Sequence, residues 1–352
     1  MVKLTVDGRE VEVPSGSFII DAAKSAGVTI PTLCYLELHK EVTGLNASCR
    51  VCCVEVAGRK NLAPACATPV AAGMEIRTDT DRVLKARKLM LELLLSDHAQ
   101  DCLTCAKAGN CGLQNLCYDY EVKESGYTGV MNSFPVDDSN EFFIRDMNKC
   151  VNCRRCANAC QFFQCTDVID FAKRGFTAHV AVPFEEPIKE SICVSCGNCV
   201  SVCPVGAMTP KSKEKFRTWE VSKTRTTCSY CGVGCSMDLL VKDGKVVGVE
   251  PADGDANNGL LCVKGKFAYG FINHPDRLKT PLVRKKGKLV EASWEEAYGV
   301  IADKFRKTKK KYGAEAFAGL TSARVTNEEN YLFQKMVRTV FGNNNVDHCA
   351  RL

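Results

Sequence analysis

The chain has 352 residues, which is too long for one small domain and enough for about two to four. Its hydrophobic content of 45% and charged content of 25% are ordinary for a globular protein, but its 23 cysteines are not. They fall in short-spaced groups within a large chain. This favours metal binding over a disulfide scaffold, which stays open as the alternative.

The formal net charge of +6 counts every cysteine as neutral. Thiols that bind metal are deprotonated, so the charge of a metal-loaded chain lies near or below zero. The basic run 309–311 is typical of a solvated helix face, and no nucleic-acid-binding pattern is present. No stretch approaches about 18 apolar residues and no signal peptide precedes the first strand, so we expect a cytoplasmic protein without a membrane span.

Residues 1–13 alternate between apolar and polar side chains around Asp7-Gly8, which predicts a hairpin. Ser17 is expected to cap a helix that runs through Ala26, with Gly27 just past its end. Four candidate metal ligands follow with the spacing C-x14-C-x2-C-x13-C: Cys34, Cys49, Cys52 and Cys66. Cys53, next to a candidate ligand, is interpreted as a core residue.

A second helix is predicted from Asp81 to Ser96, where apolar residues recur at helical spacing: Val83, Leu84, Leu91, Leu94 and Leu95. The end of this helix leads into a second ligand set, which includes a histidine: His98-x3-Cys102-x2-Cys105-x5-Cys111. Cys117 competes with His98 for the fourth ligand position. Residues 119–148 are polar and rich in turn residues, which predicts a linker or a wrapping loop.

The next segment contains one cysteine run written twice, at an offset of 43 residues. The first run comprises Cys150, Cys153, Cys156 and Cys160, and the second Cys193, Cys196, Cys199 and Cys203. The C-x2-C-x2-C-x3-C spacing is that of bacterial ferredoxins, in which the fourth cysteine of each run binds the other 4Fe–4S cluster. We therefore predict one cluster on Cys150, Cys153, Cys156 and Cys203, and a second on Cys193, Cys196, Cys199 and Cys160.

Zinc is the alternative for this segment, although zinc sites are usually built from C-x2-C pairs. Gln161 stands where Pro204 follows the second run, which departs from the usual ending. The stretch 161–190 is expected to contain a small hairpin, and Cys165 has no place in the ligand scheme.

A fifth ligand set is predicted from the spacing C-x2-C-x3-C-x26-C: Cys228, Cys231, Cys235 and Cys262. Between its members, residues 238–250 alternate in strand fashion around the turn Asp243-Gly244. Lys264 follows the last cysteine in the sequence C-V-K-G, and a plain surface lysine is one interpretation of it.

Residues 277–352 predict the opening of an α/β unit. Ser293 and Glu296 form a capping-box pattern before a helix from Trp294 to about Lys311, and a strand 315–321, a helix 327–341 and a second strand from 345 follow. Asn327 and Asn330 lie where a strand passes into a helix, a position that often faces a ligand in α/β folds. Capping by Asn327 is the alternative.

Together these motifs resemble the catalytic subunits of formate dehydrogenases in the molybdopterin oxidoreductase family. The front end resembles the 2Fe–2S variant of complex I and iron-hydrogenase subunits. The resemblance implies an α+β multidomain iron–sulfur protein. Its domains would be a β-grasp 2Fe–2S domain at 1–79, a 4Fe–4S domain with one His and three Cys ligands at 80–140, a double 4Fe–4S ferredoxin at 141–217, a 4Fe–4S molybdopterin-family domain at 221–277 and the start of the molybdopterin-binding domain at 278–352.

The same resemblance implies one 2Fe–2S cluster, four 4Fe–4S clusters and a bis-molybdopterin guanine dinucleotide with Mo or W. Formate would be converted to CO2, or the reverse, at a metal ligand beyond residue 352, so no catalytic residue is expected within the chain. Lys264 would lie between a cluster and the pterin, which Asn327 and Asn330 would contact. Electrons would pass to a partner in a hetero-oligomer: a flavin subunit that uses NAD(P), a ferredoxin or a hydrogenase subunit.

Residues 342–352 resemble the segment that precedes the metal-binding selenocysteine or cysteine of formate dehydrogenases. This predicts a UGA codon after Leu352, as in a selenoprotein of anaerobic metabolism, and a structural role for Cys349. Three other interpretations stay open: a complex I-like iron–sulfur subunit, an iron-only hydrogenase and an electron-transfer module without an active site.

Overall fold

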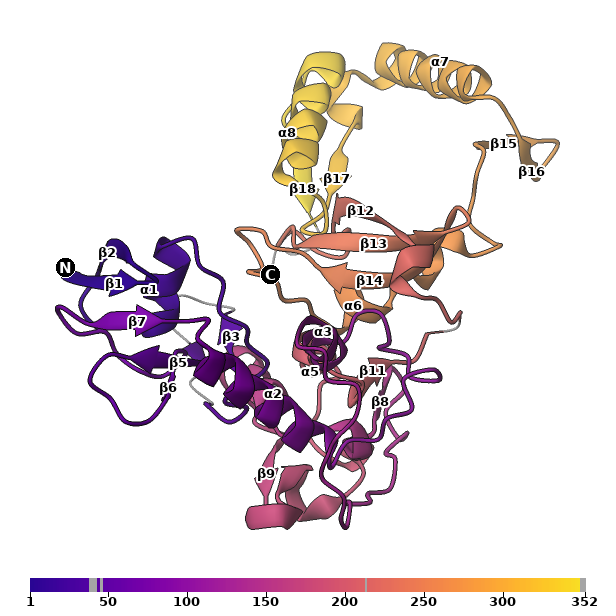
Figure 1. Cartoon of the computed structure of the whole chain (residues 1–352). Helices are drawn as coiled ribbons and strands as arrows, with labels where there is room; N and C mark the ends of the chain where they lie inside the picture. The colour runs from indigo at the N-terminus through magenta and orange to yellow at the C-terminus, as the bar shows by residue number, and fades with distance from the viewer. Residues whose placement is uncertain (38–42, 45–46, 213, 349–352) are drawn as a thin grey trace.

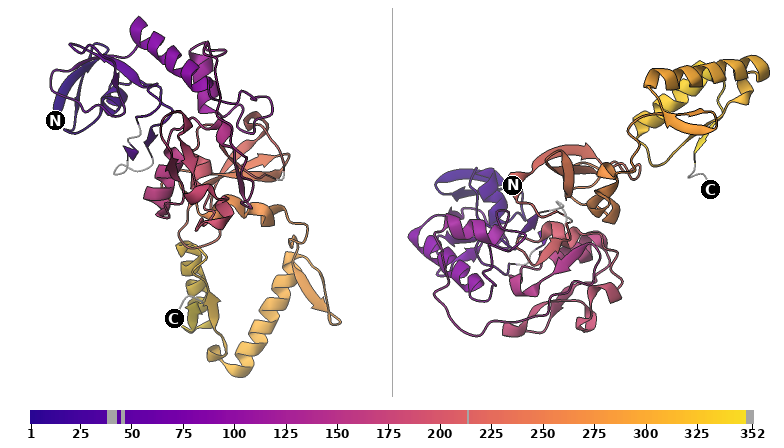
Figure 2. Two further views of the ribbon diagram at one scale, coloured as in Figure 1. Left: turned by 90° about the horizontal axis from the view of Figure 1, so that it is seen from below. Right: turned by 90° about the vertical axis from the view of Figure 1, so that its right-hand side faces the viewer.

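The computed structural model describes residues 1–37, 43–44, 47–212 and 214–348, so Cys349 and its predicted role lie outside the described residues. The N-terminal sheet and the C-terminal α/β unit lie at opposite ends, with most of the cysteine-rich segments between them (Figures 1 and 2). No helix among the described residues has the length and apolar character needed to cross a membrane.

The N-terminal unit is a sheet in the order β2-β1-β7-β5-β6, against which one helix packs. Its elements are β1 (Val2–Val6), β2 (Arg9–Val13), α1 (Ile19–Ser25), β5 (Cys53–Val56), β6 (Ala63–Pro64) and β7 (Glu75–Arg77), with a separate pair β3 (Leu36–Glu37) and β4 (Thr43–Gly44). The predicted hairpin is confirmed, and both turn residues have positive φ, 46° at Asp7 and 79° at Gly8. The predicted Ser17 cap is wrong, because Phe18 is the N-cap residue and its N–H donates to the Asp21 carboxylate at 2.8 Å.

Helix α2 (Asp81–Leu95) leads from this sheet to α3 (Gly112–Asp119). Its predicted apolar face is largely confirmed, but Leu84 is 37% exposed. The buried position one turn later belongs to Arg87, whose guanidinium donates to the Cys53 carbonyl and to the Tyr120 hydroxyl, each at 3.0 Å. A charged side chain therefore ties α2 to the sheet and to the end of α3.

The double-cysteine segment consists of short elements that wrap around the sulfurs. These are β8 (Phe143–Arg145), α4 (Arg155–Asn158), β9 (Asp170–Ala172), β10 (His179–Ala181), α5 (Asn198–Val202) and β11 (Met208–Pro210). The predicted hairpin in 161–190 is confirmed by the β9–β10 pair. The prediction of a linker or wrapping loop over 119–148 is wrong at its end, since β8 pairs with β11 and Phe143 is fully buried.

The departure at Gln161 has a visible consequence. Pro204 follows the last cysteine of the second run, where α5 has ended. Gln161 can donate its backbone N–H, and the chain continues as a π-helix over Ala159–Gln164.

An antiparallel sheet of β12 (Ser222–Thr227), β13 (Ser236–Lys242) and β14 (Lys245–Pro251) follows, with α6 (Val263–Phe267) beside β14. The predicted β13–β14 hairpin is confirmed, and it turns at Asp243-Gly244. Strand β12 was not predicted, because its side chains are almost all polar and exposed and show no alternation.

The C-terminal part comprises β15 (Leu282–Lys285), β16 (Lys288–Glu291), α7 (Trp294–Tyr312), β17 (Gly319–Thr321), α8 (Asn327–Met336) and β18 (Val346–His348). Strands β17 and β18 are parallel and α8 connects them, as predicted, although the strand predicted over 315–321 is shorter because Ala314–Ala316 forms a 3₁₀ turn.

Two capping predictions for this part need correction. Ser293 caps α7 by accepting from the Glu296 N–H, but the Glu296 carboxylate pairs with Lys285 at 2.5 Å. Thr326, not Asn327, caps α8, and it shares a reciprocal capping box with Glu329.

Candidate iron–sulfur centres

The first predicted ligand set comes together inside the N-terminal unit. The thiols of Cys34, Cys49, Cys52 and Cys66 are all buried, and Cys34 is within hydrogen-bonding reach of Cys49 and Cys66. Cys52 is in the same relation to Cys66. Hydrogen bonds from Cys49 and Cys66 lower the pKa of Cys34, and the same interaction raises the pKa of Cys49. These pairwise contacts link all four sulfurs, so the four side chains lie close together.

The second set surrounds the loop after α2. His98 is 7% exposed, burial lowers its pKa, and its buried Nδ1 has no hydrogen-bond partner among the described residues. Buried ring nitrogens are normally hydrogen-bonded, so this nitrogen fits a metal ligand.

Three cysteines of the second set gather beside this loop. Burial raises the pKa of Cys111, and the charges of Cys105 and Cys102 add to the effect. The Cys117 thiol lies near Cys111 and Cys102 too, so it stays a competitor for the fourth position.

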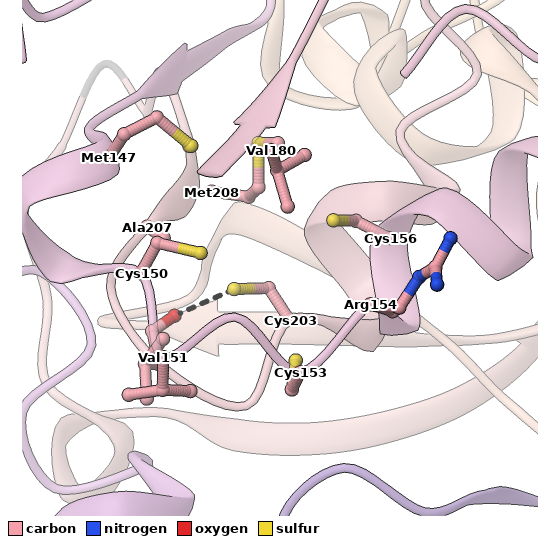
Figure 3. A pocket seen from close by; sticks show the side chains of 11 residues that line it. Met147, Cys150, Val151, Cys153, Arg154, Cys156, Val180, Cys203, Ala207 and Met208 are labelled. Carbon is pink, nitrogen blue, oxygen red and sulfur yellow. Dashed lines mark hydrogen bonds between the residues drawn. The ribbon is translucent and has the colours of Figure 1, made fainter. Parts of the chain in front are cut away.

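The first ferredoxin cavity contains the cysteines that the crossed assignment predicts. It is lined by Cys150, Cys153, Cys156 and Cys203 together with mostly apolar side chains. Figure 3 shows these four side chains around a common space, with Met147, Val180 and Met208 beside them. Burial raises the pKa of Cys150 to about 12.

The second cavity repeats the arrangement with the roles of the two runs exchanged. It is lined by Cys193, Cys196, Cys199 and Cys160. Burial raises the pKa of Cys193 and Cys196, and the Cys160 charge contributes to both shifts. Each run thus lends its last cysteine to the other cavity.

Equivalent backbone turns direct the sulfurs in both runs. Asn152 and Ser195 have φ of 51° and 53°, and each donates its N–H to the preceding cysteine sulfur at 3.4 Å. The Val168 N–H donates to Cys160 at 3.3 Å. Hydrogen bonds to ligand sulfur are one of the means by which proteins set cluster potentials.

The geometry separates clusters from a single ion such as zinc. In the part of the chain that the structure describes, no three His, Cys, Asp or Glu side chains are placed to hold one metal ion. The ferredoxin sulfurs instead line two cavities, with four cysteines to each. Four thiols around a common space fit a group that supplies several metal ions at once.

The fifth set lies on the loop between β12 and β13 and at the start of α6. Burial raises the pKa of Cys235, and the charges of Cys228, Cys231 and Cys262 raise it further, so the four predicted ligands are near one another. Cys228 is buried, whereas Cys231 and Cys262 are exposed.

The residues predicted to contact the pterin lie close to this set along the chain or in the turn that its loop touches. Lys264 is exposed. Gly232, inside the cysteine loop, donates its N–H to the Ala323 carbonyl at 2.8 Å, so the loop touches the turn between β17 and α8. In that turn Asn327 is exposed, and Asn330 accepts from the Thr321 hydroxyl at 2.5 Å.

A continuous packed interior connects the candidate centres. One apolar cluster contains Cys34 and Cys49, then Leu91 and Cys111, and then Cys153, Cys156 and Cys203. The two ferredoxin cavities are adjacent, since the Cys199 charge acts on Cys156. A Cβ added at Gly206 would lie 2.6 Å from the Cys105 sulfur, so this glycine brings the His98 set against the first cavity.

Sequence profiles of known families match the chain in five consecutive blocks. These are a 2Fe-2S iron-sulfur cluster binding domain (1–81), the NADH-ubiquinone oxidoreductase-G iron-sulfur binding region (87–126), a 4Fe-4S dicluster domain (149–207), the molybdopterin oxidoreductase Fe4S4 domain (221–274) and a molybdopterin oxidoreductase domain (277–352). The chain is a multidomain iron–sulfur protein with molybdopterin oxidoreductase domains. The predicted fold class is confirmed at this level.

Curated relatives of this iron–sulfur protein carry different names. The chain is 37% identical to the alpha subunit of an NADPH-Fe(3+) oxidoreductase of Geobacter sulfurreducens and 38% identical to a subunit of an NADH-quinone oxidoreductase of Rhizobium meliloti, over all of its length and 40% of theirs. It is 35% identical to a provisionally named formate dehydrogenase of Staphylococcus aureus, over 99% of the chain and 39% of that protein. The iron–sulfur protein described here therefore spans about 40% of the length of these relatives.

Among solved structures, it is similar to a chain of an NAD+-reducing [NiFe]-hydrogenase in the H2-reduced state. The TM-score is 0.56 at 27% sequence identity, and the match covers 62% of this chain and 90% of the other.

Two charged residues near the centres were missed at the level of sequence. Arg87 lies outside the predicted apolar face of its helix, and Lys266 follows Lys264 by two residues without any motif of its own. Both are buried, and burial lowers the pKa of Lys266 to about 8. Lys266 lies two residues beyond Lys264 and so falls on a different face of the short helix α6, which is a signal that the sequence contains.

Proposed function

We propose that this chain is an electron relay that holds five iron–sulfur clusters in a row, with a molybdopterin unit at one end. The observation that carries the proposal is the crossed pair of cysteine-lined cavities in the middle of the row. The ligands are the residues predicted from the sequence: the Cys34 set for a 2Fe–2S cluster, and the His98, Cys150, Cys193 and Cys228 sets for 4Fe–4S clusters.

When bound, such clusters accept and release one electron at a time. The chain itself contributes placement and tuning. It buries most of the ligand sulfurs, donates backbone N–H groups to them, and packs three of the five sets into one apolar interior. The exposed Lys264 and Asn327 and the partly buried Asn330 are proposed to face the pterin, because the cysteine loop at Gly232 touches the turn that carries the two asparagines.

For the complete protein we propose formate oxidation, or CO2 reduction, with Mo or W bound by a bis-pterin. Support comes from the formate dehydrogenase name of the Staphylococcus relative and from the resemblance of residues 342–348 to the segment before the metal ligand. A hetero-oligomer with a flavin, ferredoxin or hydrogenase partner follows from the names of the other relatives, which are those of subunits.

The second candidate is a complex I-like iron–sulfur subunit, which the Rhizobium relative favours at equal similarity. Analysis of the full-length protein, purified without air, distinguishes the two candidate functions by metal content and by activity with formate as electron donor. Mo or W, about eighteen iron atoms per chain and formate-dependent reduction of a viologen support the first candidate. Iron and sulfide without Mo or W, and no formate activity, support the second. Zinc in place of iron refutes the relay.

A further inference from the structure

Helix α6 touches two candidate centres at once. A Cβ added at Gly265 would lie 3.6 Å from the Cys228 sulfur, which places the helix against the molybdopterin-family set. A Cβ at Gly197 would lie 3.1 Å from the Lys266 stem and 2.6 Å from the Phe267 ring, and Gly197 sits between Cys196 and Cys199 with φ of +76°. Consecutive residues of α6 therefore bridge the Cys228 set and the second ferredoxin cavity.

Lys266 is the charged residue in this bridge. It is 6% exposed, and among the described residues its ammonium group has no ion pair and no side-chain hydrogen bond. The charged groups that act on it are the Glu250 carboxylate, the Lys107 ammonium and the Cys199 sulfur. Glu250 already pairs with Lys223 at 2.6 Å, and Lys107 adds a charge of the same sign.

A buried ammonium without a partner is costly, and proteins normally pair or neutralise such a group. An apolar side chain of similar length would pack against Gly197 equally well. The charge is explained if anionic groups lie on both sides of α6. Iron–sulfur clusters bound by four thiolates carry net negative charge, and the two thiolate sets that α6 bridges would hold such clusters.

We propose that Lys266 is a positioning residue for electron transfer between the cluster of the Cys228 set and the cluster of the Cys193 set. Its positive charge stabilises the reduced form of both clusters, so the reduction potentials of the two clusters stay close and electrons can pass between them in sequence. The inference rests on the proposed relay. In each transfer one cluster is oxidised by one electron and its neighbour is reduced by one, with no proton or bond rearranged.

The test is Lys266→Met in the full-length protein, measured by an EPR-monitored redox titration without air. We expect full iron content and an equilibrium constant for reduction at least tenfold lower at two of the 4Fe–4S clusters, which is a midpoint potential lower by about 59 mV. Lys266→Arg keeps the charge and should stay near the native potentials. The 2Fe–2S cluster is an internal control and should not shift.

The Glu250→Gln variant distinguishes the proposal from a simple electrostatic pair between Lys266 and Glu250. If the clusters are the partners of Lys266, the shift caused by Lys266→Met persists in the Glu250→Gln background. If it vanishes there, or if both potentials stay native with full iron, the proposal is overturned. Loss of iron in both Lys266→Met and Lys266→Gln would overturn it as well, since Lys266 would then be structural. Failure of the proposed relay would give a different result, because the unmodified protein itself would then contain fewer clusters than proposed.

Discussion

Replacing His98 by cysteine tests the most unusual ligand of the row. The change substitutes a thiolate for a neutral imidazole and so adds one negative charge to the cluster. His98 is 7% exposed, so we use an effective dielectric constant of about 20. A unit charge about 4 Å from the added electron then costs about 4 kcal/mol, which corresponds to a potential lower by roughly 170 mV for a one-electron couple.

The assay is an EPR-monitored titration of the full-length protein without air, with iron content measured on the same sample. Cys117→Ser is the matched control, because that thiol lies near Cys111 and Cys102 as well. We expect it to leave both iron content and potential unchanged. An unshifted potential in His98→Cys, together with loss of one cluster in Cys117→Ser, would transfer the ligand role from the imidazole to Cys117.

Three further outcomes are expected. Cys203→Ala should abolish the signal of the cluster on Cys150 and spare the other ferredoxin cluster, and loss of the other one instead would contradict the crossed assignment. Lys264→Met should slow reduction of the Cys228 cluster by formate in stopped-flow experiments at full iron content. Asp137→Asn leaves Arg145 buried without its carboxylate partner and should cost about 3 kcal/mol in denaturant unfolding. Asp137 is partly buried, which raises its pKa, but hydrogen bonds from Ser139, Ile188 and Arg145 lower the pKa overall. Its contribution to stability is thus complete above about pH 4 and is lost as the pH falls further.

The ligand sets could be predicted from the sequence because thiol chemistry and local turn geometry determine the spacing of the cysteines. The structure places the cysteines of the crossed assignment around common cavities, since three closely spaced sulfurs leave room for only one more from elsewhere. The capping prediction for α1 was wrong because two neighbouring side chains can bond to backbone N–H groups at the start of the helix. These are Ser17 and Asp21, and the Asp21 carboxylate accepts from the Phe18 N–H.

Residues whose role depends on a distant surface could not be predicted. Arg87 is buried because the Cys53 carbonyl and the Tyr120 hydroxyl, from two other parts of the chain, meet at its guanidinium. Lys266 is buried because Gly197 leaves space for its stem. Hydrophobic periodicity assigns both charged residues to the solvent, because it uses only neighbours along the chain.

The exchange of cysteines between the two ferredoxin runs has a consequence for how the protein matures. Each proposed cluster needs the last cysteine of the other run, because that cysteine lines its cavity. Whichever cluster is inserted first therefore holds both runs together and places the remaining sulfurs near their final positions. Insertion of the second cluster should accordingly be faster than insertion of the first, and unmodified molecules that contain one of the two centres should be rare during maturation.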